Sequence, residues 1–83
     1  MDDIFWDLYL RWYMTMGLGL KRKSDKTSES LIITYQNKSI VSVSIEVEDD
    51  RDSTRQQVYN RAYSSLSSWL KWKFKELNLN FTV

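Results

Sequence analysis

The sequence predicts a small α+β protein with the element order α-β-β-α-β, folded as a single domain over residues 1–83. Two stretches carry apolar residues at helical spacing, and three others alternate apolar with polar residues, which is typical of strands. We expect a three-stranded sheet with two helices on one face. Because so short a chain buries only a marginal core and leaves sheet edges open, we also expect a homodimer.

The first helix is predicted over residues 4–16. Its polar residues recur at every fourth position, and the rest of its circumference is apolar or aromatic. An ordinary surface helix needs an apolar stripe only a little over about 100° wide, so this helix has more apolar surface than one packing face hides. Gly17 ends the helix. The polar, non-periodic residues that follow predict a loop over 17–29.

A β-hairpin is predicted over residues 30–48, with strands at 30–36 and 40–48. A three-residue connection pairs Tyr35 with Val41 and places the alternating apolar residues on one face. A two-residue connection mixes the faces. We therefore expect the three-residue connection.

The second helix is predicted over residues 53–75. Ser53 is the expected N-cap, and Gln56 completes a capping box. The end of this helix is ambiguous, because residues 70–75 also alternate, and a helix places Lys73 within the apolar face.

A third strand is predicted at residues 77–83, where apolar and polar residues alternate regularly. A crossover through the second helix would set it parallel to the second strand, on the far side of the first strand.

Composition excludes several classes of function. The chain has no His, Cys or Pro, but it has four Trp, five Tyr and three Phe. Disulfides, thiolate nucleophiles, imidazole metal ligands and Ser-His triads are therefore excluded. No glycine-rich phosphate loop or nucleophile elbow is present. We expect no catalysis, no cofactor and no bound metal.

The N-terminal residues favour a cytoplasmic protein without a membrane partner. The chain starts with an acidic segment rather than the basic one of a signal peptide, and Asp7 and Arg11 interrupt its apolar run. Abundant Lys, Asn and Ile with a single Ala suggest AT-rich coding, as in many phages and low-GC bacteria.

An acidic cluster precedes the second helix. It has three interpretations: a solubilising turn that favours the helix start, a surface that docks on a basic protein groove, or an oxygen-ligand metal site. An EF-hand is excluded because its glycine is missing. The cluster consists of Glu46, Glu48, Asp49, Asp50 and Asp52.

An aromatic group on the first helix is the most informative feature. These side chains either fill the core or form an interface with a partner or a second copy, because their residue types are enriched at binding hot spots. A membrane-surface helix would carry more basic residues on its polar side. The group consists of Trp6, Tyr9, Trp12, Tyr13 and Met16.

A set of basic and aromatic residues allows nucleic-acid binding through phosphate contacts and base stacking. The competing interpretation is a solvated loop and a solvated helix face, and the net charge of +1 argues against binding by bulk electrostatics. The set consists of Arg22, Lys23, Lys71, Trp72, Lys73 and Lys75.

Together these features predict a non-catalytic protein-binding module. The most specific version is a phage or mobile-element inhibitor or modulator of a host nucleic-acid enzyme, comparable to anti-CRISPR proteins. Its acidic cluster would occupy a basic nucleic-acid groove of a larger protein, and its first helix would dimerise or anchor. The alternative function is a small nucleic-acid-binding regulator.

Overall fold

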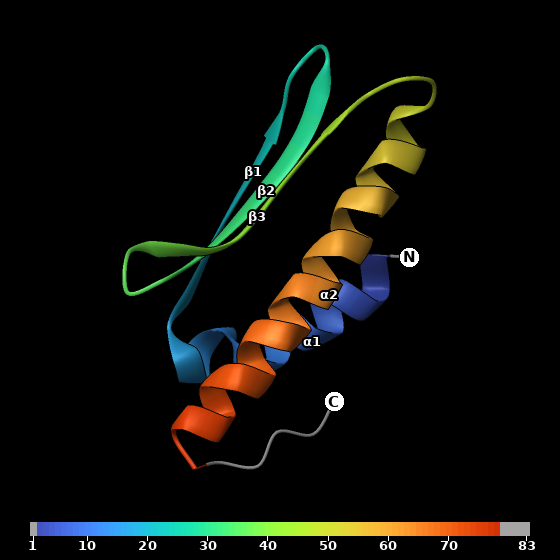
Figure 1. The fold of residues 1–83 in the computed structure, drawn as a ribbon. Coiled ribbons are helices and arrows are strands. Elements are labelled where there is room, and N and C mark those ends of the chain that lie inside the picture. Colours follow the sequence, from blue (N-terminus) through green and yellow to red (C-terminus); the bar gives the residue numbers. More distant parts are fainter. Residues whose placement is uncertain (1, 79–83) are drawn as a thin grey trace.

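A computed structural model describes residues 2–78 and shows a small α+β fold with the order α-β-β-β-α. The sheet is antiparallel throughout, with the strand order β1-β2-β3. The two helices lie side by side on one side of the sheet (Figure 1). The elements are α1 (Asp2–Met16), β1 (Leu18–Ser24), β2 (Ser28–Tyr35), β3 (Lys38–Glu46) and α2 (Arg51–Glu76).

The predicted element order is wrong, because the third strand is β1 and not a C-terminal segment. Residues 17–29, expected to form a loop, contain β1 and the turn that leads into β2. The strand expected at 77–83 is not supported: residues 77 and 78 form a turn after α2, and residues 79–83 lie outside the described part of the chain. β1 occupies the place beside β2 that was assigned to that strand, but it runs antiparallel.

β1 lacks alternation because only its first half contributes apolar side chains to the core. Leu18 is buried and Leu20 is half-buried, whereas residues 21–24 are exposed. The charged residues of the second half therefore need no apolar partners, and their pattern is that of a solvated segment.

The turn between β2 and β3 has two residues, and the expected three-residue connection is wrong. Gln36 and Asn37 both have positive φ, at 52° and 65°, and Tyr35 pairs with Lys38. Positive φ at both central positions is the requirement of a type I′ turn, whose twist matches that of the strands it joins.

An irregularity at Ile33/Thr34 restores the pairing of apolar residues that a two-residue turn would otherwise disrupt. Thr34 pairs with Ser39, but Ile33 pairs with Val41, so Ile40 is the extra residue of a β-bulge. The register differs by two residues from the expected one, in which Ile33 faced Val43. A two-residue difference keeps every side chain on its face, so the predicted apolar face is correct.

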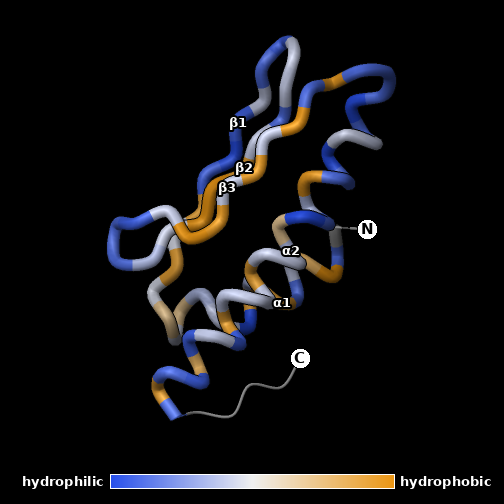
Figure 2. Tube along the Cα trace, in the orientation of Figure 1, coloured by the Kyte–Doolittle hydropathy of each residue, from blue (hydrophilic) through white to orange (hydrophobic). Residues whose placement is uncertain are grey.

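The core lies between that face and the two helices. In α2 all the buried residues except Tyr59 recur at every fourth position, so this buried stripe turns by about 40° at each step around the helix. Figure 2 shows apolar residues in the middle of the strands and polar residues at the turns and in the β3–α2 connection. The stripe consists of Thr54, Val58, Ala62, Leu66, Leu70 and Phe74.

α2 begins earlier than predicted. Asp50, not Ser53, is the N-cap: its backbone is extended, and its side chain accepts a hydrogen bond from the backbone N–H of Asp52. The helix continues to Glu76, so the alternating residues 70–75 are helical as predicted. Among residues 2–78, neither helix is long and apolar enough to cross a membrane.

Candidate binding surfaces

The acidic loop is the segment of residues 46–52, which comprises the last residue of β3, the connection and the first two residues of α2. It contains all five residues of the predicted acidic cluster. Hydrogen bonds tie it to the β1–β2 turn: the backbone N–H of Val47 donates to the carbonyl of Thr27 at 2.8 Å, and Arg51 donates to the carbonyl of Lys26 at 3.0 Å. The acidic loop is therefore fixed to a neighbouring turn at two points.

The five carboxylates of the acidic loop are all exposed. Asp50 caps α2, and Asp52 lies 4.0 Å from Arg55. Glu46, Glu48 and Asp49 make no ion pair within residues 2–78. In the same part of the chain, no three acidic residues come together as metal ligands would, so the geometry gives the metal interpretation no support.

A buried carboxylate lies behind the acidic loop. Glu29, on β2, has a side chain only 9% exposed, and it accepts hydrogen bonds from Ser24, Arg51 and Arg55. Burial by itself raises the pKa of Glu29, but the hydrogen bonds from these three donors outweigh burial, so the net pKa lies below its usual value. Glu29 thereby joins β1, β2 and α2.

Sequence reasoning missed Glu29 as a structural residue. The signal was present, because Glu29, Leu31 and Ile33 occupy alternate positions of one strand and share its buried face. Its two arginine partners come from positions 22 and 26 residues further along the chain, and no local pattern links them.

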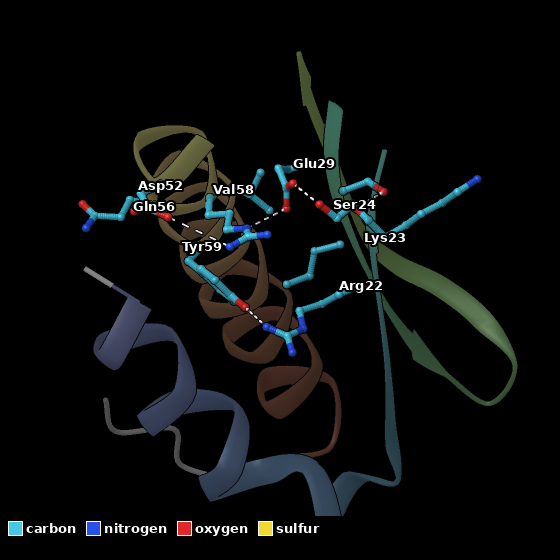
Figure 3. Close-up of a pocket in the computed structure, with 11 residues that line it drawn as sticks. Arg22, Lys23, Ser24, Glu29, Asp52, Gln56, Val58 and Tyr59 are labelled. Atoms are coloured by element: carbon cyan, nitrogen blue, oxygen red, sulfur yellow. Dashed lines mark hydrogen bonds and ion pairs between the residues drawn. The ribbon is translucent and has the colours of Figure 1, made fainter. Parts of the chain in front are cut away.

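A cleft of about 790 Å³ opens between the second half of β1, the start of β2 and the first two turns of α2 (Figure 3). It exists because α1 covers only the beginning of β1, while β1 continues beyond it. The lining residues are Arg22, Lys23, Ser24, Glu29, Ser30, Leu31, Asp52, Arg55, Gln56, Val58 and Tyr59.

Arg22 is held inside this cleft by two aromatic side chains. Its guanidinium donates a hydrogen bond to the hydroxyl of Tyr59 and lies 5.6 Å from the ring centre of Trp6. The side chain of the next residue, Lys23, extends away from the cleft (Figure 3). Of the two basic residues predicted on this segment, only Arg22 therefore projects into the cleft.

The other predicted basic residues lie near the opposite end of α2. Lys71, Trp72 and Lys75 are exposed there, and Lys71 is about 18 Å along the helix from Tyr59. The structure therefore does not bring the predicted nucleic-acid-binding set together.

Lys73 differs from its neighbours because its side chain is only 16% exposed. It donates to Glu76 at 2.9 Å and lies 5.3 Å from the ring centre of Tyr35. The hydrogen bond to Glu76 raises the pKa of Lys73. This lysine is engaged within the protein and lies against the core, as the helical interpretation of its segment requires.

The predicted aromatic group on α1 contacts the protein's own core. Tyr9 is buried, and the other four members are partly buried against the core. Trp12 packs edge-on against Phe74, with ring centres 4.8 Å apart, and Tyr13 stacks on Tyr9. Only the exposed parts of the four partly buried side chains are available for the interface that was predicted for this group. That interface stays a prediction.

Different apolar residues of α1 face outward. Ile4, Leu10 and Met14 are more than half exposed, with Met14 reaching 78%. They lie on the same side of α1 as the polar residues that recur at every fourth position of this helix. The apolar excess noted in the sequence is therefore divided between the core and this outer surface.

Comparison with known proteins does not assign a family. No protein-family model matches the chain, and neither a curated protein nor a solved structure matches it.

Proposed function

We propose that the protein is a non-catalytic binding module that docks its acidic loop into a basic groove of a larger protein. The observation that carries this proposal is a loop that is held in place by hydrogen bonds and displays exposed carboxylates. Five acidic residues occupy a seven-residue segment whose backbone is tied to the β1–β2 turn. A preorganised segment loses less conformational entropy on binding than a free loop does.

The groove that fits such a segment is one that normally holds nucleic acid. Arginine and lysine clusters recognise phosphates through charge, and closely spaced carboxylates present a similar negative field. The proposed activity is inhibition or modulation of a host nucleic-acid enzyme, as by an anti-CRISPR-like protein of a phage or mobile element. The partner would be cytoplasmic.

The alternative, a nucleic-acid-binding regulator, has less support from the geometry. The basic residues that it requires are divided between β1 and the end of α2, and Lys73 is paired with Glu76. A continuous phosphate track would need these charges side by side.

The test compares two doubly neutralised variants by capture from a bacterial lysate with mass-spectrometric identification. Glu48→Gln with Asp49→Asn removes two exposed acids and leaves the N-cap Asp50 intact. Asp3→Asn with Asp7→Asn removes the same charge from the outer side of α1. We expect the wild type and the α1 variant to capture a nucleic-acid enzyme from the lysate. The acidic-loop variant should capture at least about tenfold less of it.

A duplex competitor adds a second criterion. An enzyme already loaded with its nucleic acid should no longer be captured if the acidic loop occupies the same groove. Unchanged capture after neutralising Glu48 and Asp49 would refute the proposal. Direct DNA or RNA binding with a steep salt slope, flattened by Lys71→Ala with Lys75→Ala, would instead favour the alternative.

Homodimerisation is a separate part of the proposal. The outward apolar residues Leu10 and Met14 support it. Light scattering at micromolar concentration should give twice the chain mass of 10.0 kDa. Met14→Glu should return the mass to that of one chain, and a wild-type mass of one chain would refute the dimer.

A further inference from the structure

Beyond the proposed docking function, we propose that the cleft beside β1 binds a small organic oxyanion, with Arg22 as the principal contact. The shared chemistry is a phosphate or carboxylate group attached to a body of about mononucleotide size. The site is distinct from the acidic loop, although Asp52 belongs to both.

The first argument is the fixed position of an uncompensated charge. Arg22 makes no ion pair within residues 2–78. It is nevertheless held in one place by Tyr59 and Trp6. A guanidinium has five N–H donors, and a single hydrogen bond to Tyr59 leaves others for a ligand. Such planar donors suit the paired oxygens of a phosphate or carboxylate.

The second argument is the charge balance around Glu29. A carboxylate in the cleft would repel an anion if its charge were exposed. Glu29 is instead buried and accepts hydrogen bonds from two arginines, Arg51 and Arg55. Arg55 is 49% exposed and also lines the cleft. The lining residues therefore include two carboxylates, Glu29 and Asp52, and three cations, Arg22, Lys23 and Arg55. Arg51 binds Glu29 from outside the lining.

The third argument is size and lining. A volume of about 790 Å³ lies within the usual range of small-molecule sites, roughly 300–1,000 Å³. Leu31 and Val58 supply an apolar surface, while Ser30 and Gln56 supply uncharged hydrogen-bonding groups. Inorganic phosphate alone would fill a small part of this space. A larger body attached to the anion would cover the apolar residues as well.

Titrations followed by NMR test this proposal at about 150 mM salt, where loosely held anions are screened. The probes are adenosine monophosphate, adenosine, succinate and inorganic phosphate. We expect saturable shifts at the backbone amides of Arg22, Ser30 and Gln56 with at least one anion, and none with neutral adenosine. A response to adenosine monophosphate alone assigns a phosphate ligand, and a response to succinate alone assigns a carboxylate.

Arg22→Gln and Lys21→Gln form a matched pair for the same titration. Both remove one positive charge from β1, but Lys21 pairs with Ile32 on the open face of the sheet, away from the cleft. Arg22→Gln should weaken binding by about tenfold or more, and Lys21→Gln by less than about twofold. Tyr59→Phe, which keeps the ring and removes the hydroxyl that holds Arg22, should weaken it to an intermediate degree.

Two outcomes overturn the proposal. One is the absence of saturable shifts with every anion up to about 10 mM, an affinity too weak for a formed site. The other is equal weakening by Arg22→Gln and Lys21→Gln, which would indicate diffuse attraction. Arg22 is exposed and lies outside the core, so Arg22→Gln should fold, which a near-wild-type circular dichroism spectrum of the variant would verify. Arg22→Gln should leave lysate capture by the acidic loop unchanged, so each proposal can fail alone.

Discussion

Glu29 shows how one charged side chain organises its surroundings. It is buried on β2, where an unpaired carboxylate would be costly, and Ser24, Arg51 and Arg55 each donate to it. These donors belong to β1 and α2. The residue therefore fixes the start of α2, and with it the acidic loop, against the sheet.

Replacing Glu29 with Gln should destabilise the protein by about 1–2 kcal/mol at neutral pH, because charge-assisted hydrogen bonds to partly exposed arginines are lost. Urea denaturation measures the difference. Glu48→Gln is the matched control, since it removes the same charge from an exposed side chain without an ion pair in the described residues. Equal effects of both variants would contradict the assigned role of Glu29.

The same residue predicts a pH dependence. The folded-state pKa of Glu29 is lowered, so its contribution to stability is complete above the unfolded-state pKa of about 4.3. The contribution disappears as the pH falls from there through the lower folded-state pKa. The stability difference between wild type and Glu29→Gln should thus be constant from pH 7 to about 5 and shrink below about 4. Urea denaturation midpoints of both proteins across this pH range test the prediction. A stability difference that grows as the pH falls would contradict it.

At the scale of elements, β1 depends on a close approach to β2. A methyl group added at Gly19 would lie 2.5 Å from the hydroxyl oxygen of Thr34, which is its cross-strand partner. We expect Gly19→Ala to cost about 1–2 kcal/mol through overpacking, and Thr34→Ala in the same chain to recover most of the loss. Thermal denaturation of the single and double variants measures this coupling. Additive losses would show that the two residues do not interact.

The β2–β3 turn offers a stabilising change. Both turn residues have positive φ, for which Asn-Gly is the preferred pair. Gln36→Asn with Asn37→Gly should raise the free energy of unfolding by about 0.5–1 kcal/mol. Asn37→Val is the opposing control and should lower it, because β-branched residues resist positive φ. Chemical denaturation separates the two, and a loss from the Asn-Gly variant would argue against a type I′ turn.

The elements also show what the sequence can and cannot predict. Both helices and the β2–β3 hairpin follow from periodicity, which reports how residues divide between core and solvent. The position of β1 could not be predicted in this way, because Lys21, Arg22 and Lys23 are exposed and show no core pattern. The bulge at Ile33/Thr34 could not be predicted from alternation. A two-residue turn with a bulge and a three-residue turn without one place the same apolar residues on the same face.

The candidate sites divide in the same way. The acidic loop is contiguous in sequence, so its residues were predictable as a group. The cleft unites Arg22 with Tyr59, 37 positions apart, and only the packing of α2 across the sheet brings them together.

For the molecule as a whole, both helices are expected to unfold with the sheet in one transition. Phe5 is fully buried, and its ring lies 5.3 Å from that of Tyr59, so α1 and α2 share a core. Phe5→Ala should cost about 3–5 kcal/mol and shift the unfolding curves from circular dichroism and tryptophan fluorescence together. Leu10→Ala, at an exposed position of the same helix, should cost far less. Separate transitions for the two signals would show that α1 docks independently.

The four-residue spacing along α2 has a consequence for synthesis on the ribosome. Leu66, Leu70 and Phe74 complete the core, yet they are among the last described residues to emerge. Until they leave the exit tunnel, the sheet and α1 display uncovered apolar side chains such as Ile33 and Leu8. Chaperones can therefore bind the nascent chain while these side chains are uncovered, and the native core forms only after α2 has emerged.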